Sequence, residues 1–428
     1  MMPIIRSTDK KSLDRLLGQR ATRLEEAERV VRPILDDVRR SGDQALARLT
    51  RRLDGIDLRR QGFTVSRAEI ERAYRAVPKE FIRALPVAAR NLRRVAQRQL
   101  PTPWQIETRS GVTVGQIVRP LERVAGYVPG GRFPLPSTVL MSLIPAQVAS
   151  VREIIVTSPD PAPAVLVAAD WLGVKTIYRL GGAQAIAAFA FGTARVPRAD
   201  KIVGPGNRYV AAAKKLLAGE VSIDFVAGPT ELMIVAERGR PEWIAADLVA
   251  QAEHDTEAVA VLLTPSRRLA LEVQSATARI LQKVAAKGES CAPQALRTRG
   301  GIVLTEDLEE AIEIANAFAP EHLTLLDGAA GLMDKIRSAG SIFLGGWSAV
   351  AAGDYASGSN HILPTAGGAR MRGGLSAADF VKVISFQRLS SKGLQRLQPT
   401  IVALARSEGL EAHADSVETR FKIHGGTA

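Results

Sequence analysis

Histidine is scarce in this chain, and four of its five histidines have acidic or amide side chains close by in the sequence. They occur in Gln251-Ala-Glu-His254, Pro320-Glu-His322, Asp354-Tyr-Ala-Ser-Gly-Ser-Asn-His361 and Glu408-Gly-Leu-Glu-Ala-His413, while His424 lies in the tail. Neutral imidazole is a good zinc ligand, and a neighbouring carboxylate can orient it or share in proton transfer. One such cluster is usually a core or surface histidine with a satisfied partner. Four of them in one chain favour a metal site or an acid/base site.

The composition is that of a chain that can bury a sizeable core. With 428 residues, 46% of them hydrophobic and 24% charged, about two to four globular domains are expected. No apolar run is long enough to cross a membrane, and the first residues lack the pattern of a secretory signal, so a cytoplasmic protein is predicted. The single cysteine, Cys291, excludes an internal disulfide and a cysteine-rich metal site.

The net charge of +13 comes mostly from the first 100 residues, which contain 24 lysines and arginines against 13 aspartates and glutamates. These cations alternate with acids and with apolar residues at helical spacing, for example over residues 23–32 and 87–96. Such segments are typical of solvated helix faces. Charge alone gives only non-specific affinity for phosphates, so no nucleic-acid partner is predicted.

The elements that must position the histidine clusters alternate between strands and helices. After about 100 residues of helical patterns, short β-branched runs such as Glu153–Thr157 alternate with alanine-rich helical stretches, and a second set of this kind runs from Leu232 to Leu344. Strand–helix alternation implies right-handed crossovers and parallel sheets. We predict an α/β fold of two Rossmann-like lobes with parallel-rich sheets, a helical N-terminal segment and a helical C-terminal tail. No strand is expected in the last ~50 residues, where the period is helical.

Three glycine-rich turns lie in the first set of strands and helices: Tyr127-Val-Pro-Gly-Gly131, Gly181-Gly-Ala-Gln184 and Gly204-Pro-Gly-Asn207. The backbone amides of such turns can approach a phosphate, and the positive end of the following helix favours an anion. None of them matches the G-x-G-x-x-G dinucleotide fingerprint with its acidic residue about 20 positions later. Their spacing alone fits nucleotide binding and ordinary tight turns equally well.

Seven motifs that occur in order along the chain resemble those of the histidinol dehydrogenase family. They are Tyr127-Val-Pro-Gly-Gly, Gly204-Pro-Gly-Asn207-Arg-Tyr-Val, Ala227-Gly-Pro-Thr-Glu231, Gln251-Ala-Glu-His254-Asp, Ala319-Pro-Glu-His322-Leu, Gly353-Asp-Tyr-Ala-Ser-Gly-Ser-Asn-His361-Ile-Leu-Pro-Thr365 and Glu408-Gly-Leu-Glu-Ala-His413. Each motif alone is weak, but seven in order from about residue 20 to residue 420 are highly specific. The resemblance implies oxidation of L-histidinol to L-histidine, the last step of histidine biosynthesis, in two NAD-dependent steps at one zinc-containing site.

By this resemblance, one zinc ion per subunit is held by Gln251, His254, Asp354 and His413. The set is chemically plausible, because Gln251 and His254 stand three residues apart on a helix expected to begin at Pro241 and can face one point. Zinc without a thiolate ligand keeps its Lewis acidity and an open position for the imidazole and amine of the substrate. Without the family, Gln251 is more simply a surface amide of the helix, and Asp354 could equally cap a turn.

Glu321 and His322 correspond to the acid/base pair of the family. Pro320 favours their placement where a strand begins, so that two neighbouring side chains can reach one substrate. The implied roles are a base for the substrate hydroxyl, His322, and an activator of the water that hydrates the aldehyde, Glu321; each contributes roughly 10²–10⁴-fold. Without the family, they could be a solvated carboxylate and an ordinary strand histidine.

The resemblance also places NAD against Tyr127, Gln184 and Asn207, through stacking by the ring and hydrogen bonds from the two amides. The residues that it places against the substrate are Thr230, Gln251, His254, His322, Asp354, Glu408 and His413. Thr230 stands where the family usually has serine and adds a methyl group. A carboxylate at Glu408 suits the cationic amine of histidinol, whereas His361 fits its motif without an assigned role.

The position of Cys291 decides between two mechanisms of aldehyde oxidation. Enzymes that oxidise aldehydes commonly form a thiohemiacetal on a cysteine, and Cys291 is the one candidate in this chain. Cys291 lies in residues 287–293, which we expect to form a polar link between a helix and the next strand, away from every motif. We therefore predict oxidation of a hydrated aldehyde and not of a thiohemiacetal.

The expected organisation is an N-terminal arm (residues 1–20), a discontinuous lobe for substrate and metal (21–126 and 230–375), an NAD-binding lobe (127–229) and a helical tail used in dimerisation (376–428). The tail is too short to bury its own apolar stripe and must pack on a larger body. The resemblance implies a homodimer in which the tail reaches the partner's cleft. His413 would then complete a site whose other ligands belong to the second chain.

Two other functions are alternatives to histidinol oxidation. One is a zinc- and NAD-dependent dehydrogenase of another small alcohol, such as a sulfonated diol, but a sulfonate requires an additional cation and the sequence shows none near these motifs. The other is a basic nucleic-acid binder that has kept an old fold, which the complete set of predicted zinc ligands disfavours.

Overall fold

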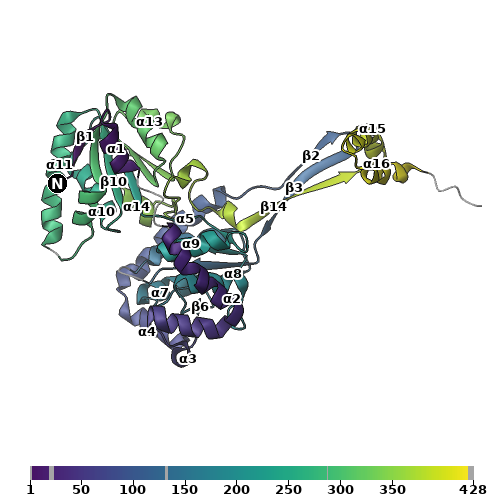
Figure 1. Cartoon of the computed structure of the whole chain (residues 1–428), viewed down its shortest axis with the longest axis horizontal. Helices are drawn as coiled ribbons and strands as arrows, with labels where there is room; N and C mark the ends of the chain where they lie inside the picture. The colour runs from purple at the N-terminus through teal and green to yellow at the C-terminus, as the bar shows by residue number, and fades with distance from the viewer. Residues whose placement is uncertain (1, 19–23, 131–133, 287, 423–428) are drawn as a thin grey trace, which may run out of the picture. The chain divides into compact units, whose positions relative to one another are not determined.

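The computed structural model describes residues 2–18, 24–130, 134–286 and 288–422. It divides into two units: the first is formed by Met1–Gln99 and Leu121–Phe380, and the second by Leu100–Pro120 and Val381–Ala428. The first unit contains two parallel sheets, and the second contains an antiparallel sheet followed by helices (Figure 1). The chain therefore leaves the first unit, returns to it, and ends in the second.

All strands of the six-stranded sheet in the first unit are parallel. In spatial order they are β1 (Ile4–Arg6), β11 (Gly300–Leu304), β10 (Val259–Thr264), β9 (Glu231–Val235), β12 (His322–Leu325) and β13 (Ser341–Leu344). Successive residues of β9 enter two different cores: Leu232 and Ile234 pack with α10 and α11, whereas Met233 and Val235 pack with α13. Both faces are thus covered by helices, which explains why these strands are apolar throughout. The helices around this sheet are α1 (Lys10–Leu17), α10 (Pro241–Ala252), α11 (Arg267–Ala285), α12 (Ala292–Thr298), α13 (Leu308–Phe318) and α14 (Val350–Tyr355).

The five-stranded sheet of the first unit is also entirely parallel. Its spatial order is β6 (Ile177–Tyr178), β5 (Glu153–Thr157), β4 (Arg123–Tyr127), β7 (Lys201–Val203) and β8 (Ser222–Ile223). From β4 the chain passes through α6 (Pro136–Val148) and α7 (Pro163–Trp171) to β5 and β6, and then through α8 (Gly182–Phe191) and α9 (Arg208–Leu217) to β7 and β8 on the other side of β4. The strand order therefore reverses between β4 and β7. In open α/β sheets, ligands bind outside the carboxyl ends of the strands at such a reversal.

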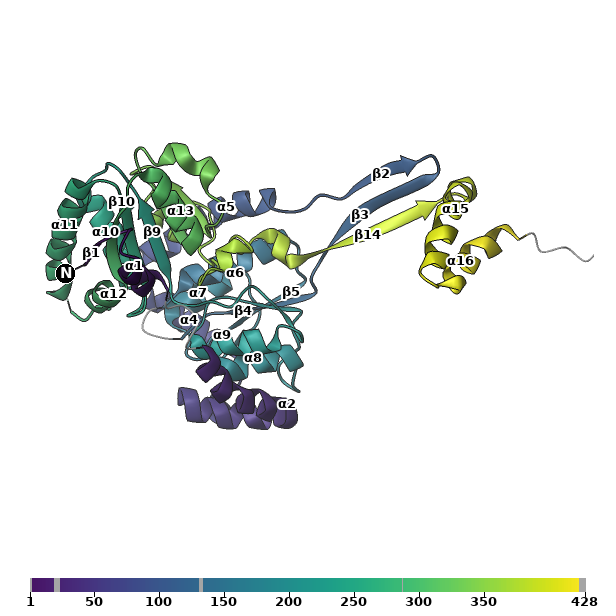
Figure 2. The same cartoon turned by 45° about the horizontal axis from the view of Figure 1, so that its top comes forward.

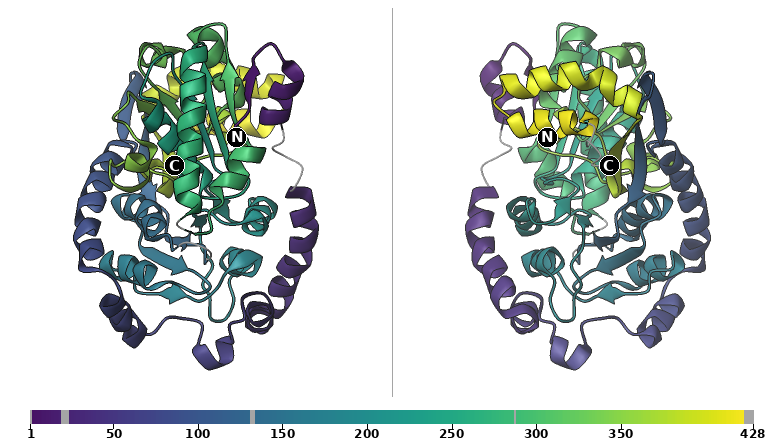
Figure 3. Two further views of the ribbon diagram at one scale, coloured as in Figure 1. Left: turned by 90° about the vertical axis from the view of Figure 1, so that its left-hand side faces the viewer. Right: turned by 90° about the vertical axis from the view of Figure 1, so that its right-hand side faces the viewer.

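Helices from the first 100 residues form an outer layer around the five-stranded sheet (Figure 3). They are α2 (Leu24–Asp54), α3 (Leu58–Gln61), α4 (Arg67–Ala76) and α5 (Lys79–Arg98). α2 packs on α8 and α9, α4 on α7, and α5 on α6. Several arginines of this layer pair with carboxylates, such as Arg48 with Asp37 at 2.8 Å, which agrees with a solvated helix surface. The predicted α/β class, its parallel sheets and its helical N-terminal segment are confirmed.

The second unit is built on a three-stranded antiparallel sheet with the order β14 (Val381–Leu389), β3 (Val112–Pro120) and β2 (Trp104–Arg109) (Figure 2). α15 (Ser391–Ser407) and α16 (Glu411–Glu418) follow β14, which confirms the predicted helical tail. The prediction that the last ~50 residues contain no strand is wrong for β14. All nine residues of β14 pair with β3, a strand far earlier in the chain, and this long-range pairing overrides the local helical period.

The remaining elements are short 3₁₀ helices, η1 (Ala330–Lys335), η2 (Gly368–Arg370), η3 (Ala377–Phe380) and η4 (Thr419–Phe421). Within the described ranges, no helix is both long and apolar enough to span a membrane. The lobe boundaries given from the sequence stay predictions.

Candidate functional site

The predicted acid/base residues lie at the amino ends of two neighbouring strands of the six-stranded sheet. Thr230 precedes β9, Glu321 precedes β12, and His322 is the first residue of β12. β9 and β12 are paired with His322 opposite Leu232, so the residues at the two strand starts meet. The Thr230 hydroxyl donates to Oε2 of Glu321 at 2.5 Å, and the Glu231 N–H donates to the same oxygen at 2.9 Å. These two hydrogen bonds fix the Glu321 carboxylate in a buried position.

A second buried carboxylate, Glu231, supports this arrangement and was not found from the sequence. Its Oε2 accepts from the N–H of Glu321 at 3.3 Å, and its Oε1 accepts from the N–H of Ala366 at 3.1 Å. Ala319, which ends α13, has a left-handed φ of 55°, so the chain turns sharply before Pro320 and enters β12. Glu231 thus ties the strand start at Glu321 to the segment after His361.

The tautomer of His322 follows from its hydrogen bond. Nδ1 lies 3.1 Å from the carbonyl oxygen of Glu231, which can only accept, so Nδ1 carries a proton. Nε2 has no hydrogen-bond partner among the described residues and lies 3.6 Å from Oδ1 of Asp354. Burial alone would lower the pKa of His322, but the Glu321 and Asp354 carboxylates raise it to about 10. Nε2 is therefore the basic nitrogen of this site.

Asp354, in α14, is surrounded by imidazoles. Burial would raise the pKa of its carboxyl, but neighbouring histidines lower it below its usual value. These histidines are His322, His361 and His254. His361 is held by hydrogen bonds to the Asp354 carbonyl (2.9 Å) and the Thr138 hydroxyl (3.3 Å), and burial lowers its pKa. The structure therefore gathers three of the scarce histidines around one carboxylate.

Three of the predicted metal ligands belong to this cluster. Gln251 lies in the last turn of α10, and its Nε2 donates to Thr230, so its Oε1 is the end that can bind a metal. His254 lies two residues beyond Ala252, where α10 ends, and not on the helix as predicted. With Asp354 they offer one amide oxygen, one imidazole and one carboxylate, a nitrogen and oxygen set that suits catalytic zinc.

The fourth predicted ligand, His413, belongs to α16 in the second unit, as Glu408 belongs to the end of α15. Over the part of the chain that the structure describes, no group of three or more His, Cys, Asp or Glu side chains could hold a metal ion by itself. The predicted ligand set includes an amide, Gln251, and is divided between the two units, so the zinc site stays a prediction.

The glycine turns meet at the strand reversal of the five-stranded sheet. Tyr127 ends β4, and Gly204 follows β7, its neighbour. Gly204 has a φ of +112°, and a Cβ there would lie 2.1 Å from the Tyr127 carbonyl oxygen, so the close approach requires glycine. Asn207 caps α9 by accepting from the N–H groups of Tyr209 and Val210. The turn therefore delivers a helix N-terminus to the place where a nucleotide is expected.

The other two residues predicted to contact NAD are buried beneath this point. Tyr127 is 3% exposed, its hydroxyl accepts from the N–H of Gly182 at 3.1 Å, and burial raises its pKa to about 12. Gln184 is 0% exposed, and its Nε2 donates to Asp54 at 2.8 Å. Its Oε1 has no partner among the residues described. Burial raises the pKa of Asp54 to about 6. Asp54, on α2, gave no signal in the sequence.

Comparisons with known proteins identify the family of this chain. The family model of histidinol dehydrogenase matches residues 17–421. The chain belongs to the histidinol dehydrogenase family. It is 48% identical to histidinol dehydrogenase of Methanothermobacter thermautotrophicus, over 92% of this chain and 93% of the relative, and 44% identical to that of Brucella suis, over 99% and 100%. The crystal structure of histidinol dehydrogenase from Elizabethkingia anophelis has a TM-score of 0.92 and 38% identity, with 99% of each chain covered.

Membership of the histidinol dehydrogenase family confirms the resemblance stated from the sequence. The chain is an NAD-dependent oxidoreductase of histidine biosynthesis. One local prediction is corrected: the segment around Cys291 is more than a polar link between a helix and the next strand, because it leads into a further helix. Cys291 is buried directly before α12, which packs on α10, β10 and β11. Pro293, near the helix start, fits the first turn of this short helix, where its missing N–H costs nothing.

Proposed function

We propose that this protein oxidises L-histidinol through L-histidinaldehyde to L-histidine, with reduction of two NAD⁺ to NADH. The observation that carries the proposal is the meeting of Thr230, Glu321 and His322 at the starts of β9 and β12, beside Asp354. Family membership supplies the substrate. The first oxidation removes a hydride and a proton from the alcohol, water adds to the aldehyde, and a second hydride and proton leave the hydrate.

His322 is the base for the substrate hydroxyl. Because Nδ1–H is held by the Glu231 carbonyl, Nε2 is directed toward Asp354 and is the atom that takes the proton. The raised pKa of His322 is caused largely by the two carboxylates beside it. A cation bound to Asp354 would offset its charge and lower the pKa of His322, so that the imidazole could be neutral at the start of the reaction.

Glu321 activates the water that hydrates the aldehyde. Its Oε2 is already occupied by the Thr230 hydroxyl and the Glu231 N–H, which orient the carboxylate. Oε1 is therefore the oxygen that we assign to the water. Thr230 keeps the hydroxyl of the family's usual serine, and that hydroxyl is used here to hold Glu321.

We assign one zinc ion per subunit to Gln251, His254 and Asp354 of one chain, with His413 of the partner subunit. When bound, zinc supplies a Lewis acid for the alcohol oxygen and an anchor for the imidazole and amine of histidinol. Glu408, which is near His413 in the sequence, would face the cationic amine. NAD is assigned to Tyr127, Gln184 and Asn207; Gln184 would accept a hydrogen bond at Oε1, the atom that has no partner within the described ranges.

A homodimer accounts for the apolar surface of the second unit. Ala405 and Gly393 are the buried residues of α15, while Leu404 and Leu410 are exposed in the single chain. Further exposed apolar side chains lie on its sheet, at Trp104, Ile106, Val383 and Ile384. A surface of this kind marks an interaction site in a soluble protein. A second copy of the chain is the partner that we propose.

The purified protein is expected to produce two NADH per L-histidinol consumed, and a chelator is expected to stop the reaction until zinc is added back. Ligands without a thiolate hold zinc less tightly than a structural cysteine site does, so the metal can be removed without unfolding. The measurement is NADH absorbance at limiting histidinol, before and after chelation, with circular dichroism to show that the fold persists.

A panel of other small alcohols, including a sulfonated diol, tests the alternative substrate class. Turnover of the sulfonated diol without turnover of histidinol would overturn the proposal. One NADH per histidinol would mean that the reaction stops at the aldehyde.

Cys291→Ser is expected to leave both oxidation steps nearly unchanged. The thiol is buried before α12, so it is not placed to attack a substrate at the starts of β9 and β12. Rates measured separately with L-histidinol and with L-histidinaldehyde test this. Loss of the aldehyde step alone would instead indicate a thiohemiacetal on Cys291.

A further inference from the structure

A buried lysine–aspartate pair holds the turn that follows β7. Lys214 of α9 is 2% exposed and Asp224, directly after β8, is 4% exposed. Nζ of Lys214 donates to Oδ1 of Asp224 at 2.7 Å and to the carbonyl oxygen of Gly204 at 2.5 Å. Oδ2 of Asp224 accepts from the N–H of Gly204 at 2.7 Å. The pair therefore binds both backbone polar groups of Gly204, one through each partner.

Gly204 is the residue on which the direction of the whole turn depends. Its positive φ and its contact with the Tyr127 carbonyl leave no room for a side chain, so its peptide groups must be held by other residues. Three residues later, Asn207 caps α9, which begins at Arg208. A rotation of the peptide groups at Gly204 would move Asn207 and the start of α9, which Asn207 caps, together.

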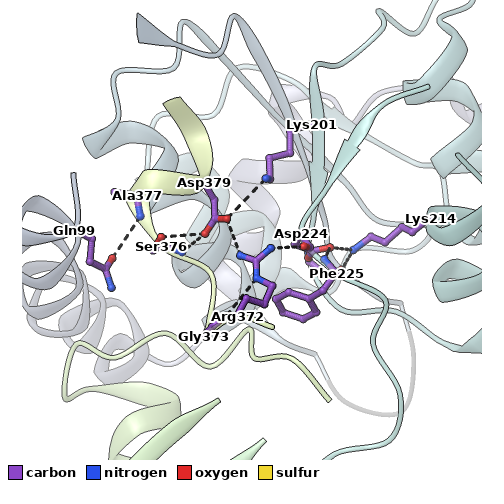
Figure 4. A network of polar contacts seen from close by, with 11 residues as sticks. Gln99, Lys201, Lys214, Asp224, Phe225, Arg372, Gly373, Ser376, Ala377 and Asp379 are labelled. Atoms are coloured by element: carbon purple, nitrogen blue, oxygen red, sulfur yellow. Dashed lines mark hydrogen bonds and ion pairs between the residues drawn. The ribbon is translucent and has the colours of Figure 1, made fainter. Parts of the chain in front are cut away.

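Asp224 is itself fixed from its other side (Figure 4). Its Oδ1 also accepts from the N–H of Phe225 at 2.7 Å, and the guanidinium of Arg372 donates to its carbonyl oxygen. Arg372 lies over the ring of Phe225, 5.2 Å from its centroid, and pairs with Asp379 at 2.6 Å. Arg372 therefore holds Asp224, and Asp224 together with Lys214 holds the turn at Gly204.

We propose that Lys214 and Asp224 are positioning residues for the nicotinamide dinucleotide: they hold the Gly204 turn so that Asn207 and the N-terminus of α9 meet the cofactor. The proposal rests on the placement of NAD at this turn given under Proposed function. Buried ion pairs can often be replaced by apolar residues without loss of stability, so the burial of this pair is weak evidence for a purely stabilising role. Lys214 and Asp224 each form a hydrogen bond with the backbone of Gly204, and two such hydrogen bonds can fix the conformation of this glycine.

The test compares Lys214→Met with the charge-neutral double variant Lys214→Met/Asp224→Asn. Lys214→Met leaves Asp224 buried without its cation, so both stability and NAD affinity should fall. The double variant removes this unpaired charge and should regain much of the thermal stability. The Gly204 carbonyl still lacks its donor, so the Kd and KM for NAD should stay raised by about tenfold or more. The KM for histidinol and the zinc content should stay near the wild-type values.

Lys215→Met is the matched control. Lys215 is the next residue of α9, and its Nζ lies 2.7 Å from Oε1 of Glu28 with half of its side chain exposed. An exposed pair of this kind contributes little, so its loss should leave NAD binding unchanged.

Three results would overturn the proposal, because each would mean that the pair serves stability alone. In the first, NAD affinity returns together with thermal stability in the double variant. In the second, the kcat and both KM values change together, and in the third neither variant folds. Failure of the proposed function is a separate result. In that case the wild-type protein itself would form no NADH from histidinol, although equilibrium binding of NAD could still be measured on every variant.

Discussion

Glu321→Gln is expected to slow the oxidation of L-histidinaldehyde by roughly 10²-fold or more while slowing the oxidation of L-histidinol much less. The glutamine has nearly the same shape, and its carbonyl oxygen can still accept from the Thr230 hydroxyl and the Glu231 N–H. It cannot take a proton from water, which is required only after the first oxidation. The two steps should therefore separate, and the aldehyde should accumulate.

Single-turnover formation of NADH, started once with the alcohol and once with the aldehyde, measures the two steps independently. Thr230→Ser is the control, because it keeps the hydroxyl that donates to Glu321 and restores the residue usual in the family. It should preserve both steps. Equal slowing of the two steps by Glu321→Gln would contradict a role limited to water activation and would indicate that Glu321 positions His322.

The fold was predictable where local pattern and tertiary structure agree. Pro241 begins α10, as expected from the preference of proline for the first turn of a helix. Pro320 directly precedes the start of β12, where Glu321 and His322 lie together. The alternation of strands and helices gave the two parallel sheets, because each buried strand is an apolar run. β14 was missed because its pairing partner, β3, is distant in the sequence.

Site residues with a local signal in the sequence were also predicted, whereas those whose role depends on long-range contacts were not. The histidines stood out because the residue is rare and its neighbours are polar. Glu231, Asp54 and the Lys214–Asp224 pair are ordinary charged residues in the sequence. Only the fold shows that Glu231, Lys214 and Asp224 are buried and that Asp54 is partly buried. Asp54 meets Gln184 from a helix 130 positions away in the chain. Buried charges are costly unless they are paired, but the pairing is long-range and leaves no periodic pattern.

Activity is expected to return when inactive His413→Ala and inactive His254→Ala proteins are mixed and allowed to exchange chains. His254 belongs to the first unit and His413 to the second, and the second unit leaves apolar side chains exposed in the single chain. If the second unit serves the partner subunit, each mixed dimer has one site with all four ligands and one site that lacks two. With equal amounts and random exchange, about a quarter of the wild-type activity should be recovered.

A mixture of His413→Ala with Glu408→Ala is the matched control, because both substitutions lie in the second unit and every mixed dimer then has two damaged sites. The activity should be measured together with the fraction of mixed dimers, obtained from mass spectrometry of differently tagged chains. Recovery in the first mixture and none in the control would locate His413 opposite the His254 of the other chain. If mixed dimers form in the first mixture and stay inactive, the second unit must complete the site of its own subunit, and the apolar surface on its helices and sheet would then serve dimer contact without sharing a ligand.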